Sequence, residues 1–557
     1  MNKRKLIPLM LSSLIFSTNL NVFANENIEI ESQQDFIHPS EIVLIDAPNF
    51  WTRINLWEED LNQFRDAILQ VHPRFWDNSN VLLPPDLTGF DSFEWAIWNE
   101  LSINLEKREN IINRIDELIS NTIHLTDFEI ATEILRISNI IRDGHLGVDF
   151  PGVTPTHIFP YNFEHLGGDD GGFYLLSTTQ NFENYLNKKI AYINDIPIED
   201  ILTTYNGISF AENRFDNRAT LGERLSNPTY LVALGLLNNG EITFTLQDEN
   251  LNNYNLTFTL DDLFLQDENL SSPVISVDTE NLPRFLNRIE FNSFYILEDY
   301  GILYIVLENM DSMEVLNYRE EDAISDFVLV LDEEILGMST NELLDILEAE
   351  NDEDNEENEE NEEPSLLTNE FMDKIREALV PNSKIIDAVE QGIVTKVIID
   401  GRRNPGGNVQ GFRNLFTFLS ENIEDGNLFY FMDNHSFSAA SNAAIVLEYL
   451  GATLVGEPTG NNLIFFGTGD SNDLEIVHSL NNSNISLGIP NELAHLGDPV
   501  SYLVTILARD EYELLSRLRD NTSNYSVFPH IEIDFTIQDW LNNNDPLLSH
   551  IKESITN

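Results

Sequence analysis

Apolar residues between Phe50 and Gly144 return every three or four positions, which places them on one face of a helix. In the first helix these residues are Trp57, Leu61, Phe64, Ile68 and Val71, ahead of Pro73. The run Thr126-Asp127-Phe128-Glu129 predicts a capping box at the start of another helix. The apolar face of that helix is Ile130, Ile134, Ile137 and Ile141. Gly144 is a natural stop, so the sequence RDGHLGV lies at the C-terminal end of the helix.

Later in the chain the patterns change to those of sheets. Lys188–Leu202 predicts a strand, a turn and a short helix, and Glu241–Leu260 predicts two alternating strands around a polar turn. From about Glu290, apolar runs such as GILYIVLE, VTKVIID and NLFYFMD alternate with helical stretches. Continuous apolar runs are typical of buried parallel strands, so this region predicts βαβ units and an α/β fold class.

A chain of 557 residues is too long for one hydrophobic core. We expect an N-terminal helical domain, a small β-rich domain and a C-terminal α/β domain, preceded by a signal peptide and a polar lead-in. The expected ranges are 1–24 for the signal, 25–47 for the lead-in, 48–154 for the helical domain, 155–290 for the β-rich domain and 291–557 for the α/β domain. An acidic, disordered insertion is expected at about 345–366.

The first residues resemble a secretory signal. Lys3, Arg4 and Lys5 give a basic start, Leu6 to Phe16 is an apolar core too short to span a bilayer, and Ala24 closes a cleavage site. We expect a secreted, extracellular protein with no stable membrane insertion after cleavage; an uncleaved anchor is the alternative. The chain has no cysteine, so neither disulfides nor lipidated cysteines are expected.

Charge narrows the possible partners. Lys and Arg number 30 against 95 Asp and Glu, a net charge of −65. Nucleic-acid binding rests on cationic contacts to phosphate, so a nucleic-acid partner is not expected. The run Glu348–Ser365 is favoured as a solvated surface insertion, because it lacks the glycine and the ligand spacing of a calcium loop. The overall charge fits either a high-salt medium or a compositional habit of the organism.

Two short stretches could carry chemistry. After a buried strand, Asn404-Pro405-Gly406-Gly407 forms a tight loop whose N–H groups could serve as an oxyanion hole, although a loop that only needs glycine for its turn is commoner. In NHSFSAASNAA, Ser438 is placed where a strand turns into a helix. That position suits a plain helix N-cap, and it also suits a nucleophile with the Ala439 N–H as an oxyanion donor. His435 is too close in the chain to be the expected base.

Together these residues resemble the C-terminal processing, or tail-specific, family of serine peptidases, in the branch similar to the tricorn protease core. The resemblance covers roughly residues 50 to 557, apart from the acidic insertion and residues 492 to 520. Its motifs are Asp400-x-Arg402-x-Asn404-x-Gly406-Gly407, Ser436-Phe437-Ser438-Ala439, Gly456-Glu457-Pro458-Thr459-Gly460 and Asp143-Gly144-His145. It implies a Clp protease/crotonase-like catalytic domain and no metal or other cofactor.

By that resemblance Ser438 is the nucleophile, and Ala439 with one glycine of the Gly406-Gly407 pair forms the oxyanion hole. Relatives that use a Ser–Lys pair carry a Lys shortly after the Gly-Glu-Pro-Thr loop, and none follows here. His145 matches the histidine of the tricorn-type arrangement and is the expected general base. Helix-end hydrogen bonding is the alternative role for His145. Asp143 and Glu457 are candidate orienting carboxylates.

Two parts of the family pattern differ in this chain. The usual Gly-Val-x-Pro-Asp motif reads Ser526-Val527-Phe528-Pro529-His530. The family's peptide-binding PDZ module is expected in the β-rich domain 155–290, where Lys188–Leu202 resembles part of such a module, but its carboxylate-binding loop is not evident. The expected function is a secreted serine endopeptidase that acts on peptides or unfolded proteins. The alternative is a catalytically inactive peptide- or ligand-binding protein on the same scaffold. A calcium-dependent surface protein is a third, weaker possibility.

Overall fold

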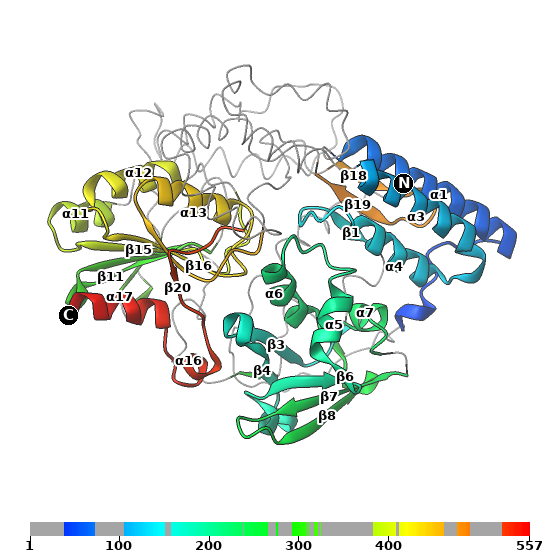
Figure 1. The fold of residues 1–557 in the computed structure, drawn as a ribbon, viewed down its shortest axis with the longest axis horizontal. Helices are drawn as coiled ribbons and strands as arrows, with labels where there is room; N and C mark the ends of the chain where they lie inside the picture. The colour runs from blue at the N-terminus through cyan, green and yellow to red at the C-terminus, as the bar shows by residue number, and fades with distance from the viewer. Residues whose placement is uncertain are drawn as a thin grey trace, which may run out of the picture. The chain divides into compact units, whose positions relative to one another are not determined.

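The chain divides into two compact units, which we describe separately (Figure 1). The computed structural model describes residues 38–72, 105–150, 157–237, 239–265, 274–276, 292–308, 310, 317–320, 323–324, 383–407, 412–461, 476–490 and 526–556. The first unit takes its described residues from before 280 and from 460–526, and the second takes the rest. The signal peptide, the lead-in and the acidic insertion predicted from the sequence lie outside the described residues, apart from 38–47.

The helical part of the first unit follows the apolar periodicity of the sequence. Its helices are α1 (Phe50–Val71), α3 (Leu105–Asn121) and α4 (Asp127–Ser138). The predicted capping box is present, because the Thr126 and Glu129 side chains each bond the other residue's backbone N–H. The predicted apolar faces of α1 and α4 meet in one buried core, except that Val71 is only partly buried.

A three-stranded antiparallel sheet joins distant parts of the chain within this unit. Its order is β1 (Gly147–Asp149), β19 (Ser486–Ile489) and β18 (Ile476–Ser479). The buried carboxylate of Asp60 on α1 accepts the backbone N–H groups of Asn482, at 3.0 Å, and Ser483, at 2.7 Å. Residues 476–490 fall within the range 291–557 expected for the α/β catalytic domain, but these contacts tie them to the helical part.

A second sheet lies in the β-rich part of the first unit. Its strands run in the order β10 (Val274–Ser276), β4 (Gly172–Thr179), β5 (Lys189–Ile193), β7 (Glu241–Gln247) and β8 (Asn253–Thr259), with β3 (Tyr161–Leu166) on β4 and β6 (Ile196–Pro197) on β5. Helices α5 (Ile198–Tyr205), α6 (Arg214–Arg224) and α7 (Pro228–Ala233) supply apolar residues to its core. The predicted strand pair of Glu241–Leu260 is β7 and β8, and the predicted strand–turn–helix is β5, β6 and α5.

The second unit is built on one mixed sheet. Its strands run in the order β14 (Ala323–Ile324), β13 (Asn317–Glu320), β11 (Ser293–Leu297), β12 (Ile302–Val306), β15 (Lys396–Asp400), β16 (Leu428–Met432), β17 (Thr453–Gly456) and β20 (Ile531–Glu532). From β12 to β20 neighbouring strands are parallel, and the predicted runs GILYIVLE, VTKVIID and NLFYFMD form β12, β15 and β16. The α/β fold class is therefore confirmed.

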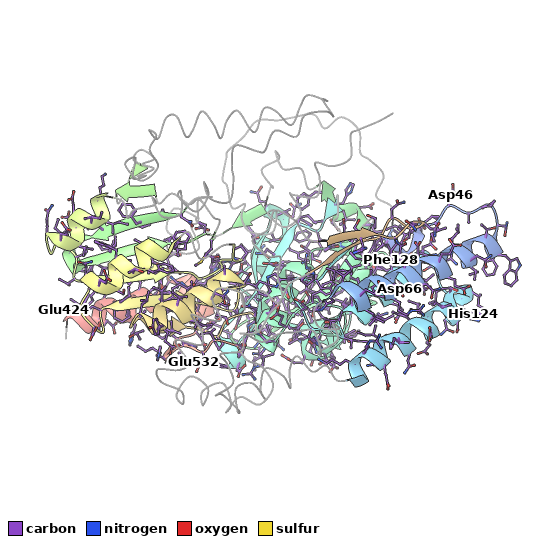
Figure 2. The ribbon with its side chains drawn as sticks, turned by 90° about the horizontal axis from the view of Figure 1, so that it is seen from above. Asp46, Asp66, His124, Phe128, Glu424 and Glu532 are labelled. Carbon is purple, nitrogen blue, oxygen red and sulfur yellow. The ribbon has the colours of Figure 1, made fainter. Side chains whose placement is uncertain are left out.

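Helices cover both faces of this sheet. In Figure 1, α11 (Ser383–Glu390), α12 (Arg413–Asn422) and α13 (Ala439–Tyr449) lie on one face and α17 (Pro546–Thr556) lies on the other, after the short helix α16 (Ile537–Leu541). Leu547, Leu548 and Ile551 of α17 pack into the sheet's core. Acidic side chains such as Asp66 and Glu424 are exposed at the surface (Figure 2). No helix in the described part of the chain is both long and apolar enough to cross a membrane.

Candidate active site

A buried ion cluster anchors the loop that follows β15. The guanidinium of Arg402 lies 2.7 Å from the Asp400 carboxylate and 2.8 Å from that of Asp545, at the start of α17. The Tyr304 hydroxyl donates to Asp400 at 2.5 Å. Burial alone would lower the pKa of Arg402, but the two carboxylates raise it well above its usual value. The charged cluster therefore fixes the loop to both the sheet and α17.

Asn404 then shapes the loop itself. Its buried side chain donates to the Leu307 carbonyl at 2.9 Å and accepts the Gly406 N–H at 2.8 Å. The Asn404 carbonyl accepts the Phe437 N–H at 2.9 Å, which brings the glycine pair beside the turn that precedes α13. Since the Gly406 N–H is engaged by Asn404, Gly407 is the member of the pair whose N–H is the better oxyanion donor.

Ser438 has a strained backbone at the N-terminus of α13. Its φ is +51° and its ψ is −119°, a combination that non-glycine residues rarely adopt. Its side chain makes no capping hydrogen bond to the helix. The plain N-cap interpretation therefore does not describe this serine, whereas a sharp strand–turn–helix elbow does.

Gly406 lies directly against this elbow. A Cβ at Gly406 would lie 2.5 Å from the Cβ of Ser438 and 3.0 Å from the Ala439 nitrogen, and φ at Gly406 is +113°. Both the contact and the dihedral angle exclude a side chain here. No acceptor for the Ala439 N–H lies among the described residues. The elbow therefore combines a serine, a helix N-terminus and an available backbone donor.

The other serines of NHSFSAASNAA have structural hydrogen bonds. Ser436 is buried, donates to the Gly401 carbonyl at 2.8 Å and accepts the Asp433 N–H at 3.0 Å. Ser441 donates to the Ser436 carbonyl at 3.2 Å. The backbone N–H of His435 donates to Asp433 at 3.1 Å, within the turn. These contacts hold the elbow in shape.

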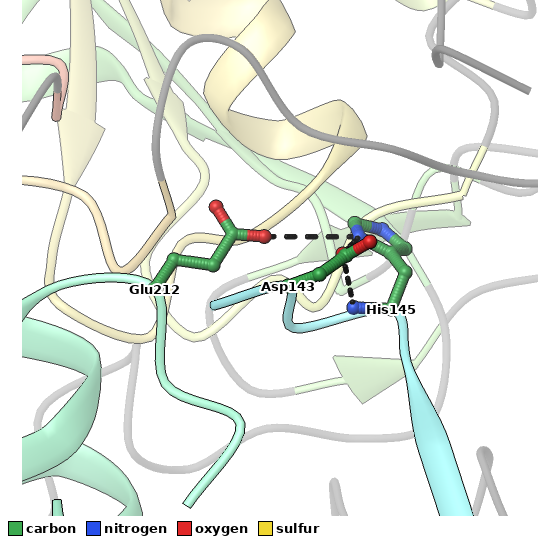
Figure 3. A group of neighbouring side chains, drawn as sticks. All are labelled: Asp143, His145 and Glu212. Carbon is green, nitrogen blue, oxygen red and sulfur yellow. Dashed lines mark hydrogen bonds and ion pairs between the residues drawn. The ribbon is translucent and has the colours of Figure 1, made fainter. Parts of the chain in front are cut away.

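In the first unit, the turn after α4 places His145 beside Asp143 (Figure 3). Asp143 is buried and accepts the His145 backbone N–H at 3.0 Å and the His72 ring at 2.8 Å. The His145 Nδ1 lies 3.8 Å from the same Asp143 oxygen. Burial would raise the pKa of Asp143, but hydrogen bonds from His145 and His72 hold it well below its usual value. A fixed carboxylate thus faces one ring nitrogen of His145.

A second carboxylate, Glu212, was not foreseen from the sequence. It lies just before α6 and accepts the Gly144 N–H at 3.0 Å, with the His145 Nδ1 4.0 Å away (Figure 3). Its own N–H donates to Asp216, and burial raises the pKa of Asp216 to about 7. No local motif marks Glu212, because its partner is 68 residues away in the chain.

Glu457, the other candidate orienting carboxylate, is in the second unit. It accepts the Phe535 N–H at 3.3 Å, and its N–H donates to the Met432 carbonyl at 3.1 Å. Burial, reinforced by Asp433 and Asp534, raises its pKa to about 8. The structure places Asp143 beside His145 in the first unit, and describes Ser438, Gly406, Gly407, Ala439 and Glu457 in the second.

His530 stands where the resembled family's closing motif has an acidic residue, and its ring makes two contacts. Its Nδ1 accepts the Leu454 N–H at 2.9 Å, so its Nε2 carries the proton that faces Glu448 at 3.0 Å. This histidine therefore joins β17 to α13 as a structural residue.

No protein-family model matches the chain, and no curated protein matches it. Solved structures do match. Mature CPAF is 12% identical over 90% of this chain and 97% of its own, with a TM-score of 0.46. The photosystem II D1 C-terminal processing protease is 10% identical over 90% and 97%, with a TM-score of 0.32. The tricorn protease is 12% identical over 90% of this chain and 37% of its own, also with a TM-score of 0.32. C-terminal processing and tricorn proteases are the groups that the sequence motifs resemble.

Proposed function

We propose that this chain is a serine peptidase that hydrolyses peptide bonds through an acyl-enzyme on Ser438. The observation that carries the proposal is the strained elbow, where Ser438 immediately precedes α13 at φ +51° and Gly406 leaves room beside it. Strain of this kind costs about 1–3 kcal/mol, persists only where the surrounding structure enforces it, and is concentrated at active sites. The sequence motifs of the peptidase family fall on these same residues.

The oxyanion hole follows from the same geometry. When the Ser438 Oγ attacks a peptide carbonyl, negative charge develops on the carbonyl oxygen. The N–H groups of Ala439 and Gly407 supply donors for that charge, and the N-terminus of α13 adds a favourable dipole. The C–N bond then breaks, the amine leaves, and water releases the acyl group from Ser438.

His145 serves as the general base. In its neutral form, Nδ1 carries the proton and faces Asp143 and Glu212, so Nε2 is the nitrogen that accepts the Ser438 proton. The same proton passes to the leaving amine. The carboxylates stabilise the imidazolium that forms in between. In this arrangement Glu212 and Asp143 are positioning residues.

The substrate is proposed to be a peptide or unfolded protein outside the cell. The N-terminal signal supports export, and the charge of −65 disfavours nucleic acid as a partner. These parts of the proposal rest on the sequence alone.

A fluorophosphonate probe tests the chemistry directly, because it reacts only with an activated serine. We expect the wild-type chain to be labelled, Ser438→Ala to be unlabelled, and His145→Ala to be labelled at least about 100-fold more slowly. Ser420→Ala, on the surface of α12, is the matched control and should label like wild type. Absence of labelling in folded wild-type protein would favour the inactive binding protein instead.

A further inference from the structure

The side chains around Gly144 also form a set of metal ligands. One oxygen each from Asp143 and Glu212 and one nitrogen from His145 all lie within 4.8 Å of one another (Figure 3). The His145 Nδ1 is 3.8 Å from Asp143 and 4.0 Å from Glu212. Zinc bonds of about 2.0–2.2 Å place tetrahedral ligand atoms roughly 3.3–3.6 Å apart, so the ligand atoms would close by at most about 1.5 Å. We propose that Asp143, His145 and Glu212 bind a divalent transition-metal ion such as Zn²⁺.

Charge supports this assignment. The Asp143 and Glu212 side chains are 0% and 1% exposed, yet both carboxyl groups face the same imidazole. Buried negative charge is costly unless a cation compensates it. A divalent ion between the three ligands would add positive charge beside both carboxylates, beyond that of the His72 ring, which already contacts Asp143 at 2.8 Å.

The ligand types select the class of metal. One imidazole nitrogen with two carboxylate oxygens suits zinc and its first-row neighbours. Mg²⁺ and Ca²⁺ prefer sites made of oxygen ligands alone. The His145 side chain is 22% exposed while its Nδ1 is buried, so the ion would be largely enclosed by its three ligands.

Such a metal would inhibit the proposed peptidase. A neutral imidazole that binds a metal through Nδ1 carries its proton on Nε2. The Nε2 of His145 then has no lone pair with which to accept the Ser438 proton. The ion would hold the base in the wrong tautomer. This inhibition rests on the proposed function, whereas metal binding itself does not.

Calorimetric titration of Zn²⁺ into the full chain tests the site. We expect one Zn²⁺ per chain and no Mg²⁺. Glu212→Gln keeps an oxygen acceptor for the Gly144 N–H, and should lower the zinc affinity by about 100-fold or more because a ligand is lost. Glu199→Gln, exposed at the start of α5, is the matched control and should bind like wild type. Thermal melting confirms that each variant is folded.

A second measurement separates the two proposals. Zinc should stop fluorophosphonate labelling over the concentration range in which it binds, and EDTA should restore labelling. With each protein's labelling expressed relative to its own metal-free rate, Glu212→Gln should require correspondingly more zinc. Folded wild type that binds no zinc, or Glu212→Gln that binds it unchanged, would overturn the metal site. Zinc binding without any labelling in metal-free protein would overturn the peptidase and leave the metal site standing. Labelling that continues with zinc bound would overturn the inhibition.

Discussion

At residue 438 the chain holds a backbone conformation that the serine would not adopt alone. Neighbouring hydrogen bonds impose this conformation. Asn404 accepts the Phe437 and Gly406 N–H groups, and the Ser436 hydroxyl donates to the Gly401 carbonyl. The Phe437 and Ser436 contacts join the glycine loop to the serine turn, and the Gly406 contact shapes the loop itself. The motif residues around Ser438 therefore act as a frame whose individual members can be tested.

Gly406→Ala should abolish labelling of Ser438 by a fluorophosphonate. The new Cβ would lie 2.5 Å from the Ser438 Cβ, so the elbow must move. Gly426→Ala is the matched control, because Gly426 also has a positive φ, +81°, but nothing within 4 Å of a Cβ. Both variants should lose about 1 kcal/mol of stability from backbone strain, with a further loss at Gly406. Equal labelling of the two variants would contradict the role of Gly406.

Glu457 should make stability depend on pH. Its pKa is raised by burial to about 8 in the folded protein, from an ordinary 4.5. The folded state therefore binds this proton more tightly than the unfolded state does, and stability falls as pH rises from about 4.5 to about 8. When the pH rises from 5 to 8, the free energy of unfolding of the wild type should fall by on the order of a few kcal/mol more than that of Glu457→Gln. Denaturant unfolding at both pH values measures the difference.

The exposed Glu424 provides the control for this measurement. Glu424→Gln should follow the wild-type dependence on pH, since its carboxyl is in water in both states. If Glu457→Gln and Glu424→Gln respond alike, the burial of Glu457 is not the cause of the pH dependence.

Helices and strands could be predicted from the sequence where their stabilising contacts are between residues close together in the chain. Patterns among neighbouring residues predicted the apolar face of α4, its Thr126 cap and the buried strand β15, and the structure contains all three. Pairings between distant segments were not predictable in the same way. The β18–β19 hairpin joins β1 from more than 300 residues away, and Glu212, just before α6, accepts the Gly144 N–H from 68 residues away. Neither contact leaves a periodic signal in the chain.

Asp60→Asn should weaken the attachment of this hairpin to α1. Its buried carboxylate accepts two backbone N–H groups, and an amide in its place would turn a donor toward at least one of them. We expect a loss of about 1–3 kcal/mol in the free energy of unfolding, measured with denaturant. Asp66→Asn, on the same helix but exposed, should change stability by less than about 0.5 kcal/mol. A similar effect of the two substitutions would show that the hairpin contact is unimportant.

For the whole molecule, the dominant physical fact is its charge. A net charge of −65 on 557 residues gives like charges across the surface, as the exposed Asp66 and Glu424 illustrate in Figure 2. Repulsion of this kind favours expanded states over compact ones. Salt shortens its range, from about 10 Å at 0.1 M to about 3 Å at 1 M. The stability of the fold is therefore coupled to the ionic strength of its surroundings.

Raising the NaCl concentration from about 0.1 M to about 1 M should raise the melting temperature, because screening relieves repulsion mainly in the folded state. KCl and NaCl at equal ionic strength should act alike if screening is the cause. Sucrose, which stabilises proteins without screening charge, separates this effect from solvent exclusion. The salt-induced rise should shrink near pH 4, where protonation removes much of the negative charge. A rise of the same size at pH 4 and pH 8 would point to exclusion of salt from the surface rather than to relief of repulsion.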